Sequence, residues 1–320
     1  MPVSEQLKTV RMMGTVIDIL IDTLDDQNSE LIIEDTIRKL DVYEKRFSAN
    51  DPKSELMAVN KAAGISPVSV HPDLYQLIKK GKAHSLAESS HLNIALGPLI
   101  KAWRIGFDDA RKPTETEISE ALQLTDPNLI HLNDERQSVY LEKKGMQIDL
   151  GALAKGYIAD LIINGLKKEP IKSAYINLGG NFVSTGFSHK RASGCYRIGI
   201  QDPARPRGNY LLAVDTLNQS VVTSGIYERT LKHEGETFHH IFDTQTGYPT
   251  ETDLASLTII SPESVDGEIW TTRLFGHSPS KILSTVEALP DIDCILITKS
   301  NTVMYSKGLE GKIIPLSPGN

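Results

Sequence analysis

The sequence predicts a globular protein that combines α-helices and β-strands in one fold. Its 320 residues are 40% hydrophobic and 23% charged, which is typical of a folded chain and sufficient for one large core or two modest ones. Short apolar runs with strand character recur along the chain, and segments with helical spacing of apolar residues lie between them. Residues that favour helix starts precede several of these segments.

The first ninety residues are expected to form a strand followed by three helices. In chain order the expected elements are a strand over residues 10–20, a helix from Asn28 or Ser29 to about Phe47, a short helical turn over 54–60, a connector or strand over 64–70 and a helix over 72–88. Asn28, Ser29 and Ser54 carry side chains that cap helix starts. Pro52 separates the first two helices because it cannot continue a helix.

Gly97 and Pro98 predict a further helix start. Pro98 suits the first helical turn, and Gly97 carries no side chain, so the backbone there stays open to close approach. Trp103, six residues after this glycine, is expected in the core rather than against a ligand. Residues 108–145 are interpreted as a variable insert with a hairpin around Asn133-Asp134, and no chemistry is recognisable in them.

The stretch DLGALAKGYIAD, residues 149–160, is the strongest local candidate for binding. An apolar run over residues 146–150 predicts a strand that turns into a helix. Ala152 and Gly156 keep bulky side chains away from the first helical turn, where free N–H groups favour an anion, and Lys155 adds a positive charge. Close packing of the helix on a neighbour explains the same small residues, and both interpretations stay open. The stretch is not a P-loop, because no Lys-Ser/Thr pair follows the second glycine.

Strands dominate the second half of the expected fold. They cover residues 173–178, 196–200 and 294–298, and a helix and a last strand complete the chain after residue 282. The first of them ends in NLGGN, residues 177–181, whose glycines permit either backbone contact with a ligand or a tight hairpin. Thr223-Ser224-Gly225 is predicted as a turn.

Two polar pairs near the end of the chain have a spacing that suits chemistry. His240 and Asp243 stand three residues apart before a turn, which fits a catalytic or metal-binding pair but also an ordinary loop. Asp266 is expected to cap a helix that places Glu268 and Thr272 one turn apart on one face. Their oxygens can serve a hard cation, or they can be a solvated carboxylate and a core hydroxyl.

Charge and cysteine content exclude several classes of protein. A net charge of −7 gives no electrostatic footprint for nucleic acid or anionic lipid. Cys195 and Cys294 have no CxxC spacing and are expected to be reduced. No stretch approaches the roughly 18 apolar residues of a membrane span, and no signal peptide is recognisable, so we expect a cytoplasmic protein without a membrane span. A protein from which a leader had been removed would show the same lack of a recognisable signal peptide.

Eight motifs occur in the order found in one known family. They are Ser54-Glu55-Leu56 with Asn60, Gly97-Pro98-Leu99 with Trp103, DLGALAKGY, NLGGN, YRIGIQDP, TSG, HIFDTQTGYP and the helix with Glu268 and Thr272. Together they resemble the ApbE-like FAD:protein FMN transferases over residues 10–310. The resemblance implies an α+β protein, with mixed sheets flanked by helices, that forms a single catalytic unit over residues 1–320.

The resemblance also implies a reaction and its site. Family members cleave FAD at its pyrophosphate, attach FMN through a phosphoester bond to a threonine of an acceptor flavoprotein, and release AMP. Mg²⁺ is expected on Glu268, Thr272 and a backbone carbonyl near Ala152. FAD is expected against Ser54, Glu55, Asn60, Gly97, Lys155, Asp160, Asn177, Gly179, Gly180, Thr223, Ser224, His240 and Asp243. His240 or Asp243 is the candidate general base, since a threonine hydroxyl is a poor nucleophile near neutral pH.

One residue departs from the pattern of the family, which usually has Asp where Glu268 stands. The extra methylene displaces the carboxylate, whereas Mg²⁺ favours a near-octahedral geometry with ligands at about 2.0–2.1 Å. Altered metal affinity and loss of transfer are therefore both open. Two alternatives stand beside the transferase: a FAD pyrophosphatase that gives FMN and AMP, and a flavin-binding protein without turnover. The acceptor protein and the oligomeric state are not specified by the sequence.

Overall fold

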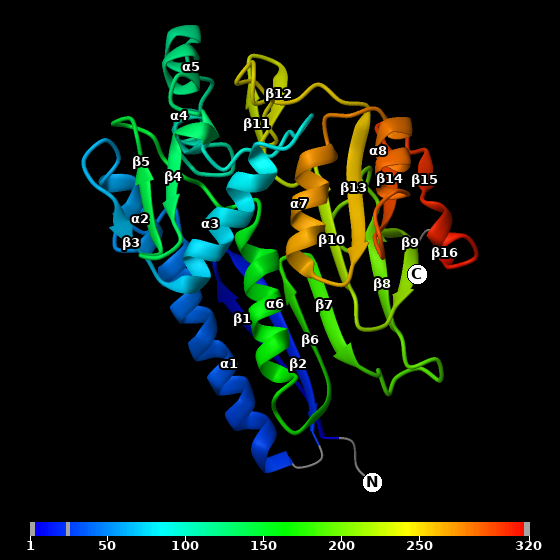
Figure 1. Ribbon diagram of the computed structural model, residues 1–320. Coiled ribbons are helices and arrows are strands. Elements are labelled where there is room, and N and C mark those ends of the chain that lie inside the picture. Colours follow the sequence, from blue (N-terminus) through cyan, green and yellow to red (C-terminus); the bar gives the residue numbers. More distant parts are fainter. Residues whose placement is uncertain (1–3, 24–25, 317–320) are drawn as a thin grey trace.

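The computed structural model describes residues 4–23 and 26–316, and a large antiparallel sheet organises them (Figure 1). Each pair of neighbouring strands in this sheet is antiparallel. In spatial order its strands are β1 (Ser4–Met12), β2 (Thr15–Thr23), β6 (Ile171–Leu178), β7 (Asn181–Gly186), β10 (Ser220–Gly225), β13 (Leu254–Ser261), β14 (Asp293–Thr298) and β15 (Val303–Tyr305).

Helices cover one face of this sheet, toward which alternate apolar side chains point. Ile17 and Ile19 of β2 and Ile176 of β6 are fully buried in the cluster beneath these helices. Figure 1 shows the helices side by side in front of the sheet. They are α1 (Asp26–Phe47), α6 (Ala154–Leu166) and α7 (Ser264–Leu274). The alternation is what a strand with a buried face requires.

A three-stranded sheet covers part of the opposite face. Its strands, in spatial order, are β16 (Ile313–Pro315), β9 (Tyr210–Thr216) and β8 (Tyr196–Gln201). Val214 of this sheet shares a buried cluster with Phe182 and Val221 of the central sheet. Because the central strands are covered on both faces, every residue of β13 is buried.

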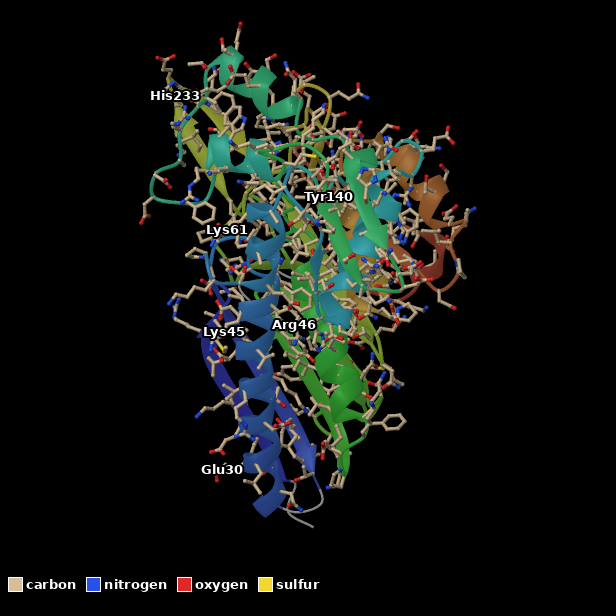
Figure 2. The ribbon with its side chains drawn as sticks, turned by 60° about the vertical axis from the view of Figure 1, so that its left-hand side comes forward. Glu30, Lys45, Arg46, Lys61, Tyr140 and His233 are labelled. Carbon is tan, nitrogen blue, oxygen red and sulfur yellow. The ribbon has the colours of Figure 1, made fainter. Side chains whose placement is uncertain are left out.

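The remaining elements surround the helical layer and the sheet ends. They are α2 (Glu55–Lys61), α3 (Pro72–Ser85), α4 (Gly97–Trp103), α5 (Glu115–Leu122), α8 (Pro279–Val286), β3 (Val68–Ser69), β4 (Ile130–Asn133), β5 (Ser138–Leu141), β11 (Thr230–His233), β12 (Glu236–His239) and the 3₁₀ turns η1 (Pro127–Leu129) and η2 (Lys307–Leu309). Figure 2 shows Lys45 and Arg46 on different sides of α1. Lys45 is exposed, whereas Arg46 points inward and pairs with Asp73 of α3 at 2.8 Å, which ties α1 to α3.

The expectation of a single strand over residues 10–20 is wrong, because the chain turns back inside this run. Met13 and Gly14 have positive φ angles of 54° and 68° and close a tight hairpin between β1 and β2. Glycine adopts such angles without steric cost, so Gly14 was the available signal for this turn.

The strand predicted over residues 146–150 is also wrong. The side chain of Asn60 takes the place of a neighbouring strand here: its Oδ1 accepts from the Ile148 N–H at 2.8 Å, and its Nδ2 donates to the Ile148 carbonyl at 2.9 Å. The helix that follows begins at Ala154, after a turn that starts at Gly151.

Three smaller predictions are corrected. Thr223-Ser224-Gly225 is the end of β10 and not a turn, because it stays paired with β13. Asp266 lies in the first turn of α7 rather than at its cap, which is at Glu263. Helix α3 ends at Ser85, whose Oγ donates to the Gly81 carbonyl at 2.7 Å within the last turn.

Other sequence predictions are confirmed. Helix α1 ends at Phe47, although it begins at Asp26. Ser54 caps α2 by accepting a hydrogen bond from the Met57 N–H at 3.0 Å. The hairpin around Asn133-Asp134 is present as β4 and β5, and both cysteines are free. Among the helices of the described residues, none has the length and apolar character needed to cross a membrane.

Candidate active site

A cavity of about 770 Å³ lies where the start of α6, the helix α7 and the ends of β6 and β10 meet. Figure 1 shows α6 beside α7, with these strands behind them. Ten of the residues predicted for the site line its wall: Ala152, Lys155, Asn177, Gly179, Gly180, Thr223, Ser224, His240, Glu268 and Thr272. The volume suits a cofactor, since ligand pockets typically measure roughly 300–1,000 Å³.

Glu268 is the charged centre of this wall. Its side chain is buried, and its Oε1 accepts a hydrogen bond from Asn181 Nδ2 at 2.5 Å and contacts the Lys155 ammonium at 3.1 Å. Thr272 lies one turn further along α7 and also lines the cavity. A buried carboxylate needs such partners, because removal of an isolated charge from water is costly.

The oxygens around Glu268 fit a hard cation. Lys155 Nζ, itself a cation, bridges Glu268 Oε1 at 3.1 Å and the Gly151 carbonyl at 3.4 Å. Thr272 and Ala152 line the same wall, and a hydroxyl and a backbone carbonyl are oxygen donors of the kind that Mg²⁺ prefers. In the described part of the chain no three His, Cys, Asp or Glu side chains are grouped to hold a metal, so hydroxyl and carbonyl oxygens would have to complete the set.

The turn between β6 and β7 presents backbone to the cavity. Gly179 and Gly180 have positive φ angles of 62° and 108°, and Asn177 Oδ1 accepts a hydrogen bond from the Gly180 N–H at 2.9 Å. A Cβ on Gly179 would lie 2.2 Å from Thr15 Oγ1, so no side chain fits there. The glycines therefore serve both the hairpin and an open wall, which combines the two interpretations of NLGGN.

His240 faces the cavity as a neutral imidazole. Burial, together with the nearby Arg229 charge, lowers its pKa to about 4, and its Nδ1 lies 3.4 Å from the Arg229 carbonyl oxygen. Asp243 is not among the residues that line the wall. Its Oδ1 accepts hydrogen bonds from the backbone N–H groups of Gln245 and Thr246 at 2.7 and 2.9 Å, so its carboxylate holds the turn that follows.

Ser54 and Glu55 are likewise outside the cavity wall. Ser54 is buried at the start of α2, where its Oγ also donates to the Ser48 carbonyl at 2.5 Å. Glu55 accepts a hydrogen bond from the backbone N–H of His71 and pairs with Arg46 at 3.4 Å. In the described structure these two side chains fix α2 against its neighbours.

Asn60 and Gly97 hold the segment that precedes the central motif. Asn60 makes the two hydrogen bonds to Ile148 described above, across 88 positions of sequence. A Cβ on Gly97 would lie 2.6 Å from the Gln147 carbonyl oxygen, so glycine is needed for the close approach of these two segments. Neither residue lines the cavity, and both instead hold the segment that leads to Asp149 on its wall.

Gly156 packs on a helix and does not line the cavity. A Cβ built on it would lie 2.5 Å from the Ser264 carbonyl oxygen and 2.7 Å from Glu268 Cγ. Real Cβ atoms essentially never come within 3.0 Å of another heavy atom, so a side chain here requires α6 and α7 to separate. For this glycine the structure favours the packing interpretation over the anion-binding one.

Comparison with known proteins decides the family. The sequence profile of the ApbE family matches residues 13–296. The chain belongs to the ApbE family. A FAD:protein FMN transferase of Klebsiella pneumoniae is 39% identical to it over 277 residues, which are 87% of this chain and 85% of that protein. A FAD:protein FMN transferase of Treponema pallidum is 34% identical, over 88% of this chain and 81% of that protein.

Solved structures of ApbE proteins share the fold. The ApbE protein of Thermotoga maritima matches with a TM-score of 0.86 and 25% identity, over 96% of this chain and 99% of that one. The flavin transferase ApbE of Vibrio cholerae matches with a TM-score of 0.82 at 19% identity, over 97% of this chain and 100% of that one. The predicted family and the predicted α+β class are thus confirmed.

Asp149 and Arg229 are charged residues of the cavity wall that were not predicted as site residues from the sequence of this ApbE protein. Asp149 Oδ1 accepts a hydrogen bond from the Gly151 N–H at 2.7 Å, and burial raises the pKa of its carboxyl. Asp149 could have been recognised in the sequence, because a charged residue between the apolar Ile148 and Leu150 is unusual. Arg229 lies near enough to influence the pKa values of both Asp149 and His240, and no sequence pattern pointed to it.

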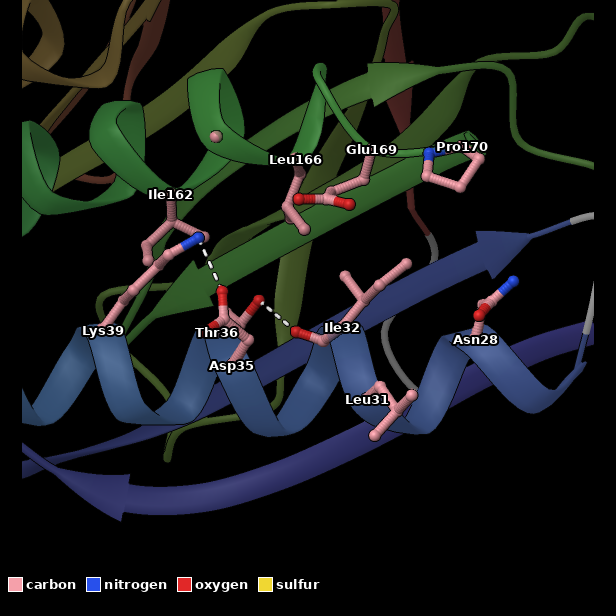
Figure 3. A pocket seen from close by; sticks show the side chains of 11 residues that line it. Asn28, Leu31, Ile32, Asp35, Thr36, Lys39, Ile162, Leu166, Glu169 and Pro170 are labelled. Atoms are coloured by element: carbon pink, nitrogen blue, oxygen red, sulfur yellow. Dashed lines mark hydrogen bonds and ion pairs between the residues drawn. The ribbon is translucent and has the colours of Figure 1, made fainter.

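A second hollow, of about 330 Å³, lies between α1 and α6 (Figure 3). Ile32 of α1 and Leu166 of α6 point toward one another across it, and Lys39 at one end pairs with Asp35 at 2.7 Å. None of the residues predicted for the ApbE site lines this hollow. The larger cavity is therefore the candidate active site.

Proposed function

We propose that this chain is a Mg²⁺-dependent FAD:protein FMN transferase, which moves FMN from FAD to a threonine of an acceptor flavoprotein and releases AMP. The observation that carries the proposal is the meeting of Glu268, Lys155 and the first turn of α6 on one wall of a cavity of cofactor size. Family membership and the names of the two relatives support the same activity.

The wall of the cavity suits the parts of FAD. Tyr175, Phe182 and Tyr196 supply flat apolar surfaces, with ring centroids 5.3 to 5.7 Å apart, against which ring systems can pack. The Lys155 ammonium and the positive end of the α6 dipole favour the negative pyrophosphate. Bound at Glu268, Mg²⁺ would supply Lewis-acid stabilisation of the charge that develops on the departing phosphate.

His240 is the general base in this proposal. In the transfer step the threonine Oγ of the acceptor attacks the phosphorus on the FMN side of FAD, and the bond from that phosphorus to the bridging oxygen breaks. AMP leaves with the bridging oxygen, and the hydroxyl proton passes to His240, which is neutral above its lowered pKa. Asp243 is unsuited to this role because it holds a turn outside the cavity.

A pH profile tests the base. Since the pKa of His240 is lowered to about 4, kcat for transfer at saturating Mg²⁺ should show an acid limb near that pH as the imidazole is protonated, separate from the titration of Asp160, whose pKa is raised to about 7. His240→Gln should lower kcat by roughly 10²–10⁴-fold and remove this acid limb. The measurement is kcat at saturating FAD from pH 4 to 8, and a variant with the parental rate and profile would exclude His240 as the base.

One incubation separates the three candidate functions. Purified protein is incubated with FAD, Mg²⁺ and an acceptor domain that carries a target threonine, and the products are resolved by mass spectrometry. Covalent FMN on the acceptor, with one AMP released per adduct, is the expected result. FMN and AMP without an adduct would identify a pyrophosphatase, and intact bound FAD would identify a flavin-binding protein without turnover.

A cytoplasmic location also belongs to this proposal. FAD is made inside cells, so an enzyme that works there needs no exported flavin supply. The single catalytic unit over residues 1–320 and the variable character of residues 108–145 stay predictions from the sequence.

A further inference from the structure

Asp160 joins α6 to α7 and does not line the cavity. Its side chain is buried, with 8% of the residue exposed. Its Oδ1 accepts a hydrogen bond from the Ser264 N–H at 2.7 Å, and its Oδ2 accepts one from the Val265 N–H at 2.8 Å. These N–H groups belong to the first turn of α7, where a helix leaves its donors without internal partners.

The cap of α7 is thus supplied by another helix. Glu263 occupies the N-cap position, but its side chain makes no capping hydrogen bond within the part of the chain that the structure describes. The contact between Asp160 and the start of α7 fixes both the position and the direction of the helix, because two N–H groups of the backbone meet the two oxygens of one carboxylate.

We propose that Asp160 is a positioning residue that sets the placement of α7, and with it the placement of Glu268 and Thr272 against Lys155. This inference rests on the proposed function for the role of those three side chains. On α6, Lys155 precedes Asp160 by five residues, and on α7 Glu268 follows Ser264 by four. The Lys155–Glu268 pair at 3.1 Å and the Asp160 hydrogen bonds therefore tie the two helices at two separate levels.

Between these two ties the helices are in direct contact. Gly156 lies against the Ser264 carbonyl and Glu268 Cγ, so the helices touch without a side chain between them. Such a contact fixes the separation of the helices but not the rotation of α7 about its own axis. The two directed hydrogen bonds of Asp160 supply that constraint, and a small rotation of α7 would move the Glu268 carboxylate along the cavity wall.

The protonation state of Asp160 changes near neutral pH. Burial, helped by the negative Glu263 and Asp266, raises its pKa to about 7, although its two backbone hydrogen bonds act in the opposite direction. Lys80 of α3 lies 3.7 Å from Glu263 and 3.5 Å from Asp266 and partly offsets their charge. Protonation turns one carboxylate oxygen into a hydroxyl, which is a weaker acceptor, so one of the two hydrogen bonds weakens. Metal affinity should therefore rise as the pH rises through 7.

The matched variants are Asp160→Asn, which keeps one acceptor oxygen, and Asp160→Ala, which keeps none. Thr114→Ala is the control, because Thr114 caps α5 by accepting from the Glu117 N–H at 3.2 Å and is not on the cavity wall. Three quantities are measured: Mn²⁺ affinity by electron paramagnetic resonance without FAD, kcat and KM for FAD with Mg²⁺, and amide hydrogen exchange in α7.

Both Asp160 variants should bind Mn²⁺ about 10–100-fold more weakly and lower kcat by a similar factor, with a smaller change in KM for FAD. Amide exchange should accelerate in the first turn of α7, and the increase of Mn²⁺ affinity through pH 7 should disappear in Asp160→Asn. Thr114→Ala should accelerate exchange in α5 alone and leave Mn²⁺ affinity unchanged.

Parental Mn²⁺ affinity and parental kcat per folded molecule in both Asp160 variants would overturn the proposal, because the carboxylate would then only stabilise the fold. If Asp160→Ala does not fold, Asp160→Asn decides by the same criteria. A parent protein that binds Mn²⁺ but transfers no flavin would contradict the proposed function while the metal measurements still judge Asp160. A parent that binds no Mn²⁺ would overturn the positioning role as stated.

Discussion

Glu268→Ala is expected to lower kcat for flavin transfer by more than ~10²-fold while the protein stays folded. The substitution removes the carboxylate that we assign to Mg²⁺ and on which Lys155 and Asn181 converge at 3.1 and 2.5 Å. Lys155 is partly exposed and can turn to solvent, so the unpaired ammonium does not stay buried. The cost in unfolding free energy should be about 1–3 kcal/mol, mainly from the unpaired Asn181 amide.

Two variants control this experiment. Glu268→Asp should retain or raise activity, because the proteins that this chain resembles usually have Asp at this position. Asp266→Ala removes a carboxylate two residues earlier, which pairs with Lys80 at 3.5 Å and does not line the cavity. It should keep the parental rate at pH 8, where Asp160 is largely ionised in both proteins. Transfer by Glu268→Ala at the parental rate in Mg²⁺ would refute the metal assignment.

The sequence predicted the residues that line the cavity better than it predicted those that hold the backbone around it. Lys155, Glu268 and Thr272 were placed by motif and helical spacing, and the structure brings them to one cavity. Asn60 and Asp160 were predicted to contact FAD, but they bond to the backbone of distant segments, at Ile148 and at the start of α7. A motif marks polar residues that a site requires, and it does not separate those that touch a ligand from those that hold the backbone behind it.

The same limit explains the errors in secondary structure. The apolar run over residues 146–150 has the composition of a strand, but its main chain is satisfied by Asn60, 88 positions away, and no local pattern encodes that contact. By contrast, the hairpin at Met13 and Gly14 was encoded locally by the glycine. Composition and periodicity could therefore have revealed the turn at Met13-Gly14, but they cannot reveal a long-range hydrogen bond such as that of Asn60.

Gly156→Val is expected to reduce stability and flavin binding together. The added Cβ would meet the Ser264 carbonyl oxygen at 2.5 Å, and a backbone oxygen inside a capped helix cannot move aside without shifting α7. Overpacking of this kind typically costs about 1–3 kcal/mol, and a β-branched residue in a helix adds a few tenths at most relative to other side chains. Because Glu268 Cγ would lie 2.7 Å from the same Cβ, displacement of α7 also moves the proposed metal carboxylate.

Gly165→Val is the matched control for this change. It puts the same side chain in the same helix, where the nearest atom to an added Cβ is Lys39 Nζ at 4.0 Å, so it tests helix propensity without a clash. Urea unfolding and FAD titration of both variants give the two free energies to compare. If Gly156→Val loses much of both its unfolding free energy and its FAD affinity, while Gly165→Val changes little, the role of Gly156 is to allow α6 to pack on α7. A Gly156→Val protein as stable as the control but unable to bind FAD would instead mean that this glycine keeps space for the phosphates themselves.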